Sequence, residues 1–239
     1  MSSADSIQTF DEERAAGYDD RIRRVAPGYD LLQDAVASAL ETTLGEDARL
    51  LVVGAGTGAE IRAMGRARPG WHFTAVDPSA AMLDRCRRRM QAAGLDERVT
   101  YVCERVEDWT PSAPFDGATA VFVSHFLDAA ATRRFFGAVA RSLQKTAPLV
   151  VADLFADGPG TDPERLRAAW RRWCLRNGMS DEEVETARAR MDEGISAVSE
   201  ATLTALLGEV GCAAPTRLFQ CFRWGAWWTR RVESPAEPE

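Results

Sequence analysis

Three glycines and one aspartate have the spacing that most clearly indicates ligand binding. Gly54, Gly56 and Gly58 follow an apolar run, and Asp77 comes about 20 residues later. Glycines allow positive φ angles and let a ligand approach the backbone, while a helix N-terminus after them offers free N–H groups. An aspartate at the end of the next strand can accept hydrogen bonds from both hydroxyls of a ribose. The pattern therefore predicts a site for a nucleotide-like ligand.

Two alternatives accompany this interpretation. Asp77 could cap a helix, although Ser79 is better placed to do so. In addition, Gly54-x-Gly56-x-x-Ala59 satisfies the dinucleotide fingerprint, so NAD(P) is a competing ligand for the same turn.

The segment Ser124-His125-Phe126-Leu127 is the second candidate for chemistry, because it directly follows the fourth predicted strand. Ligands of open parallel sheets bind beyond the carboxyl ends of the strands, so this segment should face the reacting group. Imidazole titrates near neutral pH, which suits His125 as a general base on a hydroxyl or amine. A role as a pocket wall fits His125 equally well, and His72, inside the second strand, is expected to be structural.

The elements that must position these residues alternate between strands and helices. Such alternation predicts a mostly parallel sheet with helices on both faces. Two helices within residues 6–46 precede the first strand and should form an N-terminal helical cap. Strands are predicted over 49–53, 71–76, 98–103, 115–123 and 148–154, and helices over 58–67, 80–92 and 129–144.

The pattern changes after the fifth strand. A helical insertion, assigned to residues 158–196, contains two polar helices, and a further helix covers 199–210. Two final strands, over 216–223 and 225–231, are joined by a tight turn and should be antiparallel. We predict a single domain over residues 1–231 and a disordered tail over 232–239.

Composition limits the classes of partner. The chain has 239 residues and a net charge of −7, and it lacks a basic, aromatic-rich platform, which argues against nucleic acid. No apolar stretch approaches the about 20 residues that span a bilayer, and the N-terminus lacks a signal-peptide pattern. The five cysteines are scattered, so we expect neither disulfides nor a metal site. A cytoplasmic protein with a small-molecule substrate is the expectation.

The helices before the first strand and the final antiparallel pair favour a particular family over NAD-binding proteins. With them the chain resembles class I S-adenosylmethionine (SAM)-dependent methyltransferases, whose Rossmann-like seven-strand sheet ends in an antiparallel strand. The resemblance extends over residues 10–231. Within this fold the chain is most similar to the carboxy-SAM synthase group, which modifies tRNA. Three stretches carry that similarity: Arg24-Val25-Ala26-Pro27-Gly28-Tyr29, Asp77-Pro78-Ser79-Ala80-Ala81-Met82 with Arg85-Cys86-Arg87-Arg88, and Phe219-Gln220-Cys221-Phe222 before Gly225.

The resemblance implies SAM as cofactor and S-adenosylhomocysteine as product. It places the glycine turn at the methionine end of SAM, with Arg24 as a candidate partner of the methionine carboxylate; a solvated helix-end charge is an equal alternative for Arg24. Arg105 stands where the family often has an acid, and an arginine cannot accept a hydrogen bond from the adenine amino group. Its guanidinium would stack on the ring, or its backbone would contact adenine. Alternatively, Asp108 would accept the hydrogen bond. The implied cofactor-binding residues are Arg24, Tyr29, Gly54, Ala55, Gly56, Asp77, Pro78, Met82, Arg105, Val106 and Val123.

Leu206 marks a departure from the carboxy-SAM synthase group. It aligns with the arginine that holds the extra carboxylate in that group, and a leucine cannot pair with that charge, so unmodified SAM is predicted. The chain should then methylate an oxygen, nitrogen or carbon of a small molecule. Three alternatives stay open: an NAD(P)-dependent oxidoreductase, a carboxy-SAM synthase-like or tRNA-modification enzyme, and a SAM-binding protein without activity.

Trp170 and Trp173 lie on one face of the first helix of the insertion. This spacing fits ordinary packing against the core. It also fits a lid or a dimer surface, because tryptophan anchors interfaces well. A homodimer is therefore compatible with the sequence.

Overall fold

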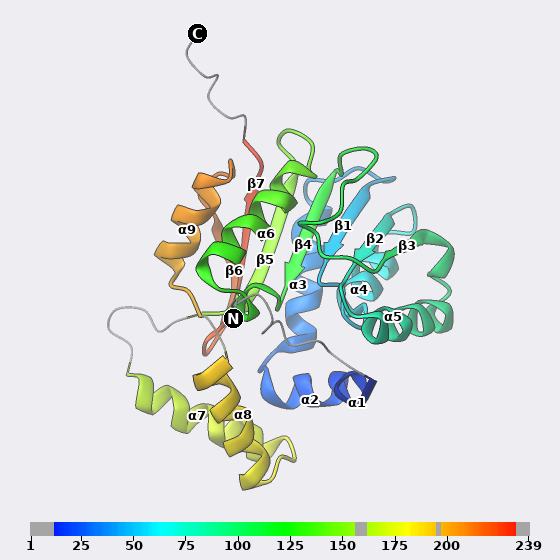
Figure 1. Ribbon diagram of the computed structural model, residues 1–239. Coiled ribbons are helices and arrows are strands. Elements are labelled where there is room, and N and C mark those ends of the chain that lie inside the picture. Colours follow the sequence, from blue (N-terminus) through cyan, green and yellow to red (C-terminus); the bar gives the residue numbers. More distant parts are fainter. Residues whose placement is uncertain (1–11, 156–161, 195–196, 233–239) are drawn as a thin grey trace, which may run out of the picture.

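A seven-stranded sheet forms the centre of the protein, which Figure 1 shows as a computed structural model. The structure describes residues 12–155, 162–194 and 197–232. The strand order is β3-β2-β1-β4-β5-β7-β6, and only β7 runs antiparallel to its neighbours. This confirms the predicted Rossmann-like methyltransferase sheet. The strands are β1 (Arg49–Val53), β2 (His72–Val76), β3 (Val99–Val102), β4 (Gly117–Val121), β5 (Pro148–Leu154), β6 (Thr216–Cys221) and β7 (Trp224–Arg230).

Helices cover both faces of the sheet because the strand residues are apolar on both sides. In β1, Leu50 and Val52 belong to the core cluster shared with α3, α4 and α5, while Leu51 and Val53 belong to the cluster shared with α6 and α9. All four are buried, as expected for a central parallel strand. The bounds of these helices are α3 (Tyr29–Glu41), α4 (Ala59–Ala67), α5 (Ala80–Ala93), α6 (Ala129–Arg141) and α9 (Glu200–Glu209).

The remaining helices, α1 (Glu12–Ala15), α2 (Tyr18–Val25), α7 (Pro163–Arg176) and α8 (Asp181–Gly194), gather at one end of the sheet (Figure 1). The sequence predicted two helices before β1, the first of which begins outside the described residues. In the described part Gly17 adopts a φ of 68° and separates α1 from α2. The indole Nε1 of Trp170 donates to Val25 O at 2.8 Å, and that of Trp173 donates to Arg24 O at 3.1 Å. These two tryptophans therefore fasten α7 to the end of α2.

β4 ends two residues earlier than predicted. Phe122 has a φ of 59°, an unusual conformation for a residue with a side chain, and its N–H donates to Ala152 O at 2.7 Å. The chain then forms a short 3₁₀ turn over Ser124–Phe126. Strained backbone of this kind concentrates at functional sites. Here it turns the residues after β4 toward the end of β5.

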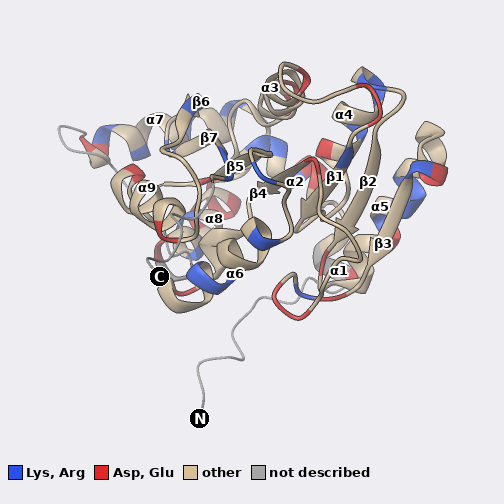
Figure 2. Ribbon diagram, turned by 90° about the horizontal axis from the view of Figure 1, so that it is seen from above, with Lys and Arg blue, Asp and Glu red and all other residues tan. Residues whose placement is uncertain are grey.

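Basic residues appear as blue bands on α4 and α5, although the chain as a whole is acidic (Figure 2). In the part of the chain that the structure describes, no helix is both long and apolar enough to cross a membrane.

Candidate active site

The glycine turn joins β1 to α4 and takes the conformation that its glycines permit. Gly54, Gly56 and Gly58 have φ angles of 65°, 52° and 77°. A Cβ atom on Gly54 would lie 2.2 Å from a methyl group of Val123, so a side chain there would collide with the segment after β4. The N–H groups of Gly54 and Ala55 donate to Val76 O, which holds the turn against the end of β2.

Asp77 follows β2 and faces the glycine turn. Its Oδ2 accepts from the N–H of Gly56 at 2.9 Å and its Oδ1 accepts from the N–H of Ser79 at 2.8 Å. Burial raises the pKa of Asp77, and these two backbone hydrogen bonds oppose the shift. The Ser79 hydroxyl accepts from the N–H of Met82 at 3.2 Å and caps α5, as predicted. Asp77 is thus available for ligand binding.

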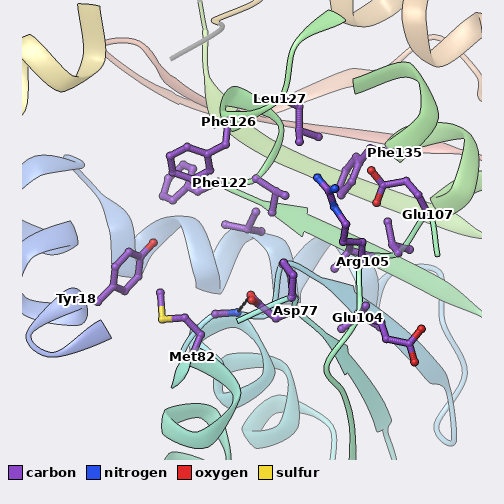
Figure 3. A pocket seen from close by; sticks show the side chains of 18 residues that line it. Tyr18, Asp77, Met82, Glu104, Arg105, Glu107, Phe122, Phe126, Leu127 and Phe135 are labelled. Atoms are coloured by element: carbon purple, nitrogen blue, oxygen red, sulfur yellow. Dashed lines mark hydrogen bonds between the residues drawn. The ribbon is translucent and has the colours of Figure 1, made fainter. Parts of the chain in front are cut away.

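A cavity opens beyond the carboxyl ends of β1, β2 and β4. Its volume is about 120 Å³, and about 800 Å³ when the adjoining space open to solvent is counted. Figure 3 shows Tyr18 of α2 on one side and Arg105 on the other, with Asp77 between them and Phe126 opposite Asp77. Of the predicted residues, the lining includes Gly54, Gly56, Asp77, Pro78, Met82, Arg105, Val106 and Val123.

Four predicted residues lie outside this lining. Ala55 is buried in the turn. The Tyr29 ring is buried and stacks near Phe122, with ring centroids 6.0 Å apart. The Arg24 guanidinium lies 3.7 Å from Glu183 of α8, so the packing of α8 directs it away from the cavity. His125, the fourth, is paired with a residue of β5.

Of the segment Ser124-His125-Phe126-Leu127, predicted to face the reacting group, Phe126 and Leu127 line the cavity. The sequence did not point to four other lining residues, Tyr18, Glu104, Glu107 and Phe135. Glu104 follows β3 much as Asp77 follows β2. Its position after a strand could therefore have identified it as a lining residue. Asp108, the predicted alternative acceptor for adenine, is not in the lining; its N–H closes a turn on Arg105 O at 3.0 Å.

A polar network fastens the cap to the glycine turn. The Thr57 hydroxyl donates to Asp19 Oδ1 of α2 at 2.8 Å, and Arg89 of α5 donates to Thr57 at 3.1 Å. Arg89 also forms an ion pair with Asp19. Next to this network, burial raises the pKa of Tyr18, so the phenol that lines the cavity is neutral. The cap, the turn and α5 are thereby connected through charge-assisted contacts.

Glu60, in the first turn of α4, is a buried acid that the sequence reasoning did not select. Its side chain is 4% exposed, and Thr119 of β4 donates a hydrogen bond to its Oε1 at 3.2 Å. Burial raises the pKa of Glu60 to about 8; the Thr119 hydrogen bond opposes this rise and Asp77 adds to it. Glu60 is therefore protonated at neutral pH.

His125 and Asp153 form a buried pair where β4 and β5 end. The His125 Nδ1 contacts Asp153 Oδ1, and the backbone N–H of His125 donates to Oδ2 at 3.1 Å. The Ser124 hydroxyl and the N–H of Leu154 also donate to Asp153. Burial alone would raise the pKa of Asp153, but the charge of His125 and these hydrogen bonds lower it. An ionised carboxylate on Nδ1 leaves Nε2 as the nitrogen that can accept a proton.

Comparison with known proteins agrees with this architecture. Residues 50–146, which contain the glycine turn, Asp77 and His125, match a family model described as a methyltransferase domain. The carboxy-S-adenosyl-L-methionine synthase of Erwinia tasmaniensis is 27% identical over 223 residues, which cover 91% of this chain and 89% of that protein. The enzyme of the same name from Yersinia pestis is also 27% identical over 223 residues, with coverage of 91% and 82%.

These matches make the chain similar to class I SAM-dependent methyltransferases, with a methyltransferase domain over residues 50–146. Solved structures share the fold of this methyltransferase. The mitomycin 7-O-methyltransferase has a TM-score of 0.68 at 17% identity, with 93% of this chain and 58% of that chain covered. An O-methyltransferase from neocarzinostatin biosynthesis, solved with SAM and 2-hydroxy-5-methyl naphthoic acid, has a TM-score of 0.64 at 17% identity, with coverage of 93% and 59%. The chain therefore spans about three fifths of these two structures.

SAM is the cofactor of this methyltransferase, and the residues present fit it. The bare backbone of Gly54 and Gly56 borders the cavity, and the Asp77 carboxylate lies beside it, as a ribose site requires. The matches do not favour the NAD(P)-dependent alternative. Leu206 lies on the buried face of α9 and is not part of the cavity lining, so it makes no contact there that would select between SAM and carboxy-SAM.

Replacing Asp77 by alanine is expected to weaken SAM binding at least about tenfold, because the buried acceptor of the ribose hydroxyls is lost. Isothermal titration calorimetry measures the change. The matched control is Ser79→Ala, which removes the cap of α5 and is expected to cost about 1 kcal/mol of stability with little change in SAM affinity. Unchanged affinity in Asp77→Ala would show that Asp77 does not bind the cofactor.

Proposed function

We propose that this methyltransferase transfers the methyl group of SAM to a nucleophile of a small molecule, with His125 as general base. The observation that carries the proposal is the His125–Asp153 pair, which lies next to the segment after β4 that lines the cavity. Phe126 links the two places, because its ring is part of the lining and its centroid lies 3.9 Å from that of His125.

SAM supplies a methyl group that its positively charged sulfur already activates. The protein then has to remove a proton from the acceptor and align it with that methyl group. His125 Nε2 accepts the proton, while Asp153 holds the imidazole in one orientation and stabilises its charged form. Phe122, Phe126 and Leu127 provide apolar walls that exclude water from the reacting atoms.

We propose that the rest of the site holds the cofactor and selects the acceptor. The glycine turn and Asp77 would bind the methionine and ribose parts, and Arg105 with Val106 would border the adenine. The apolar, aromatic lining favours an acceptor with an apolar or aromatic body. The naphthoic acid bound by the neocarzinostatin enzyme has such a body, although that enzyme shares only the fold with this chain.

Incubation with SAM and a panel of phenols, carboxylic acids, amines and thiols tests the proposal. Release of S-adenosylhomocysteine together with a methylated product is expected for at least one class. SAM binding without turnover on the whole panel would contradict the proposal and favour the non-catalytic alternative.

The relatives named carboxy-SAM synthase support a second candidate function, the synthesis of carboxy-SAM. Mass spectrometry of the incubated cofactor separates the two candidates. A cofactor product heavier by the mass of carbon dioxide would identify carboxy-SAM synthesis, whereas methyl transfer yields S-adenosylhomocysteine. The homodimer stays a prediction, which light scattering of the purified protein checks.

A further inference from the structure

A second cleft lies between α3 and α4, and it shares no lining residue with the cofactor cavity. Arginine and aspartate side chains surround it, together with one glutamine. The proposed methyl transfer gives none of these residues a role. The blue bands on α4 in Figure 2 mark the basic residues of that helix.

Some of the charges at this cleft already have partners. Arg23 Nε donates to both carboxylate oxygens of Asp30, at 3.0 and 2.9 Å. Arg89 is paired with Asp19 and bonded to Thr57. In each of these two ion pairs the charges of the arginine and the aspartate cancel, so neither pair offers a net charge to a ligand.

Arg62 and Arg66 are different. They are exposed, lie four residues apart on α4 and so share one face of the helix. Among the described residues neither makes a hydrogen bond or an ion pair, and the same holds for Asp34, the remaining carboxylate of the cleft. The unpaired charges of the cleft are therefore two guanidinium groups and one carboxylate. Like charges at this spacing destabilise a helix, and a bound anion would relieve their repulsion.

Gln33 of α3 supplies an independent indication of a ligand. It lines the same cleft and is 4% exposed. Both Nε2 and Oε1 of its amide are buried with no hydrogen-bond partner among the residues that the structure describes. Burial of an amide without partners is costly, so such groups are normally satisfied. A group that both accepts and donates a hydrogen bond would satisfy this amide.

We propose that this cleft binds a phosphate group. Arg62 and Arg66 pair with its charge, as arginines do at phosphate sites. The Gln33 amide donates to one phosphate oxygen and accepts from a phosphate O–H. Sulfate and carboxylate anions at neutral pH carry no such O–H and satisfy only half of the amide. Free phosphate keeps an O–H at neutral pH, whereas a phosphate monoester is mostly a dianion without one, so free phosphate is the expected ligand.

Thermal unfolding and calorimetry with inorganic phosphate, at constant ionic strength, test the site. Wild-type protein is expected to bind phosphate and to gain a higher Tm in phosphate than in sulfate. The sulfate arm matters because both anions also stabilise proteins by exclusion from their surface. A second arm with glycerol phosphate separates the sources: tighter binding of the ester assigns the cleft to monoesters, and weaker binding assigns it to the free ion.

The double variant Arg62→Gln/Arg66→Gln is expected to weaken phosphate binding by about tenfold or more. The matched control is Arg172→Gln/Arg176→Gln on α7. This exposed pair has the same spacing and the same change in charge, it lies outside the cleft, and phosphate binding should be unchanged. Asp34→Asn removes the opposing carboxylate and is expected to tighten phosphate binding.

Gln33→Leu keeps the approximate size of the side chain and removes the unpartnered amide. We expect a higher Tm without phosphate, which shows that the variant folds, and loss of the difference between phosphate and sulfate. Equal responses to phosphate and sulfate in the wild type would overturn the proposal. So would wild-type phosphate affinity in the Arg62→Gln/Arg66→Gln variant.

Discussion

Replacing His125 by alanine is expected to lower kcat for methyl transfer by about 10²–10⁴-fold, the range typical of a lost general base. SAM affinity should stay unchanged, because the change leaves the glycine turn and Asp77, which we assign to the cofactor, in place. The acceptor found with the nucleophile panel provides the kinetic assay, and calorimetry provides the SAM affinity. A loss that grows as the acceptor becomes less acidic would identify proton removal as the step that His125 assists.

Variants around the pair distinguish a base from a pocket wall. Asp153→Asn removes the negative charge on Nδ1 and is expected to lower kcat, whereas Ser124→Ala removes only one of the hydrogen bonds to Asp153 and should have a small effect. Equal losses of turnover and SAM affinity in His125→Ala would make His125 a wall residue.

Glu60→Gln is expected to remove a large pH dependence of stability. The pKa of Glu60 rises from an ordinary value of 4.5 to about 8 in the folded protein. Between these pH values the unfolded chain releases a proton that the folded protein keeps, so the free energy of unfolding falls as the pH rises. The loss is about 1.4 kcal/mol per unit, on the order of 4 kcal/mol over the whole window. Glutamine does not titrate, so it avoids this loss.

Urea unfolding of both proteins at several pH values measures the effect. The difference in the free energy of unfolding should be smallest below pH 4.5 and should grow, in favour of Glu60→Gln, until pH 8. Thr119→Val removes the hydrogen bond to Glu60, which favours the charged carboxylate. The pKa of Glu60 in the folded protein should therefore rise further, and stability should keep falling to a higher pH. A difference that is constant with pH would mean that Glu60 titrates like an exposed acid.

Local patterns were enough to predict the sheet. The apolar run over residues 148–154 coincides with β5, and the glycine turn and the capping Ser79 lie where the spacing placed them. The division into α1 and α2 was not predicted, because the helical periodicity continues through Gly17 and gives no sign of the positive φ there. Helix boundaries near a glycine depend on packing that a local pattern does not contain.

The site was predictable only where neighbours in sequence determine it. Asp77 and the glycine turn are recognisable from their spacing. By contrast, Glu60 is hydrogen-bonded to Thr119, 59 residues away, and His125 is paired with Asp153, 28 residues away. A single carboxylate in the apolar strand 148–154 was the one sign of the second pair. The direction of Arg24 depends on the docking of α8, which no local pattern describes.

The position of β7 has a consequence for the protein during its synthesis. β7 is the last strand in sequence, yet it lies between β5 and β6 and pairs with β5 from Pro148 to Leu154. Until residues 224–230 leave the ribosome, β5 presents a bare edge able to pair with other chains. The same strand carries Asp153, which orients His125. A nascent chain can therefore bring His125 and Asp153 together early, but this strand keeps one unpaired edge until β7 is added.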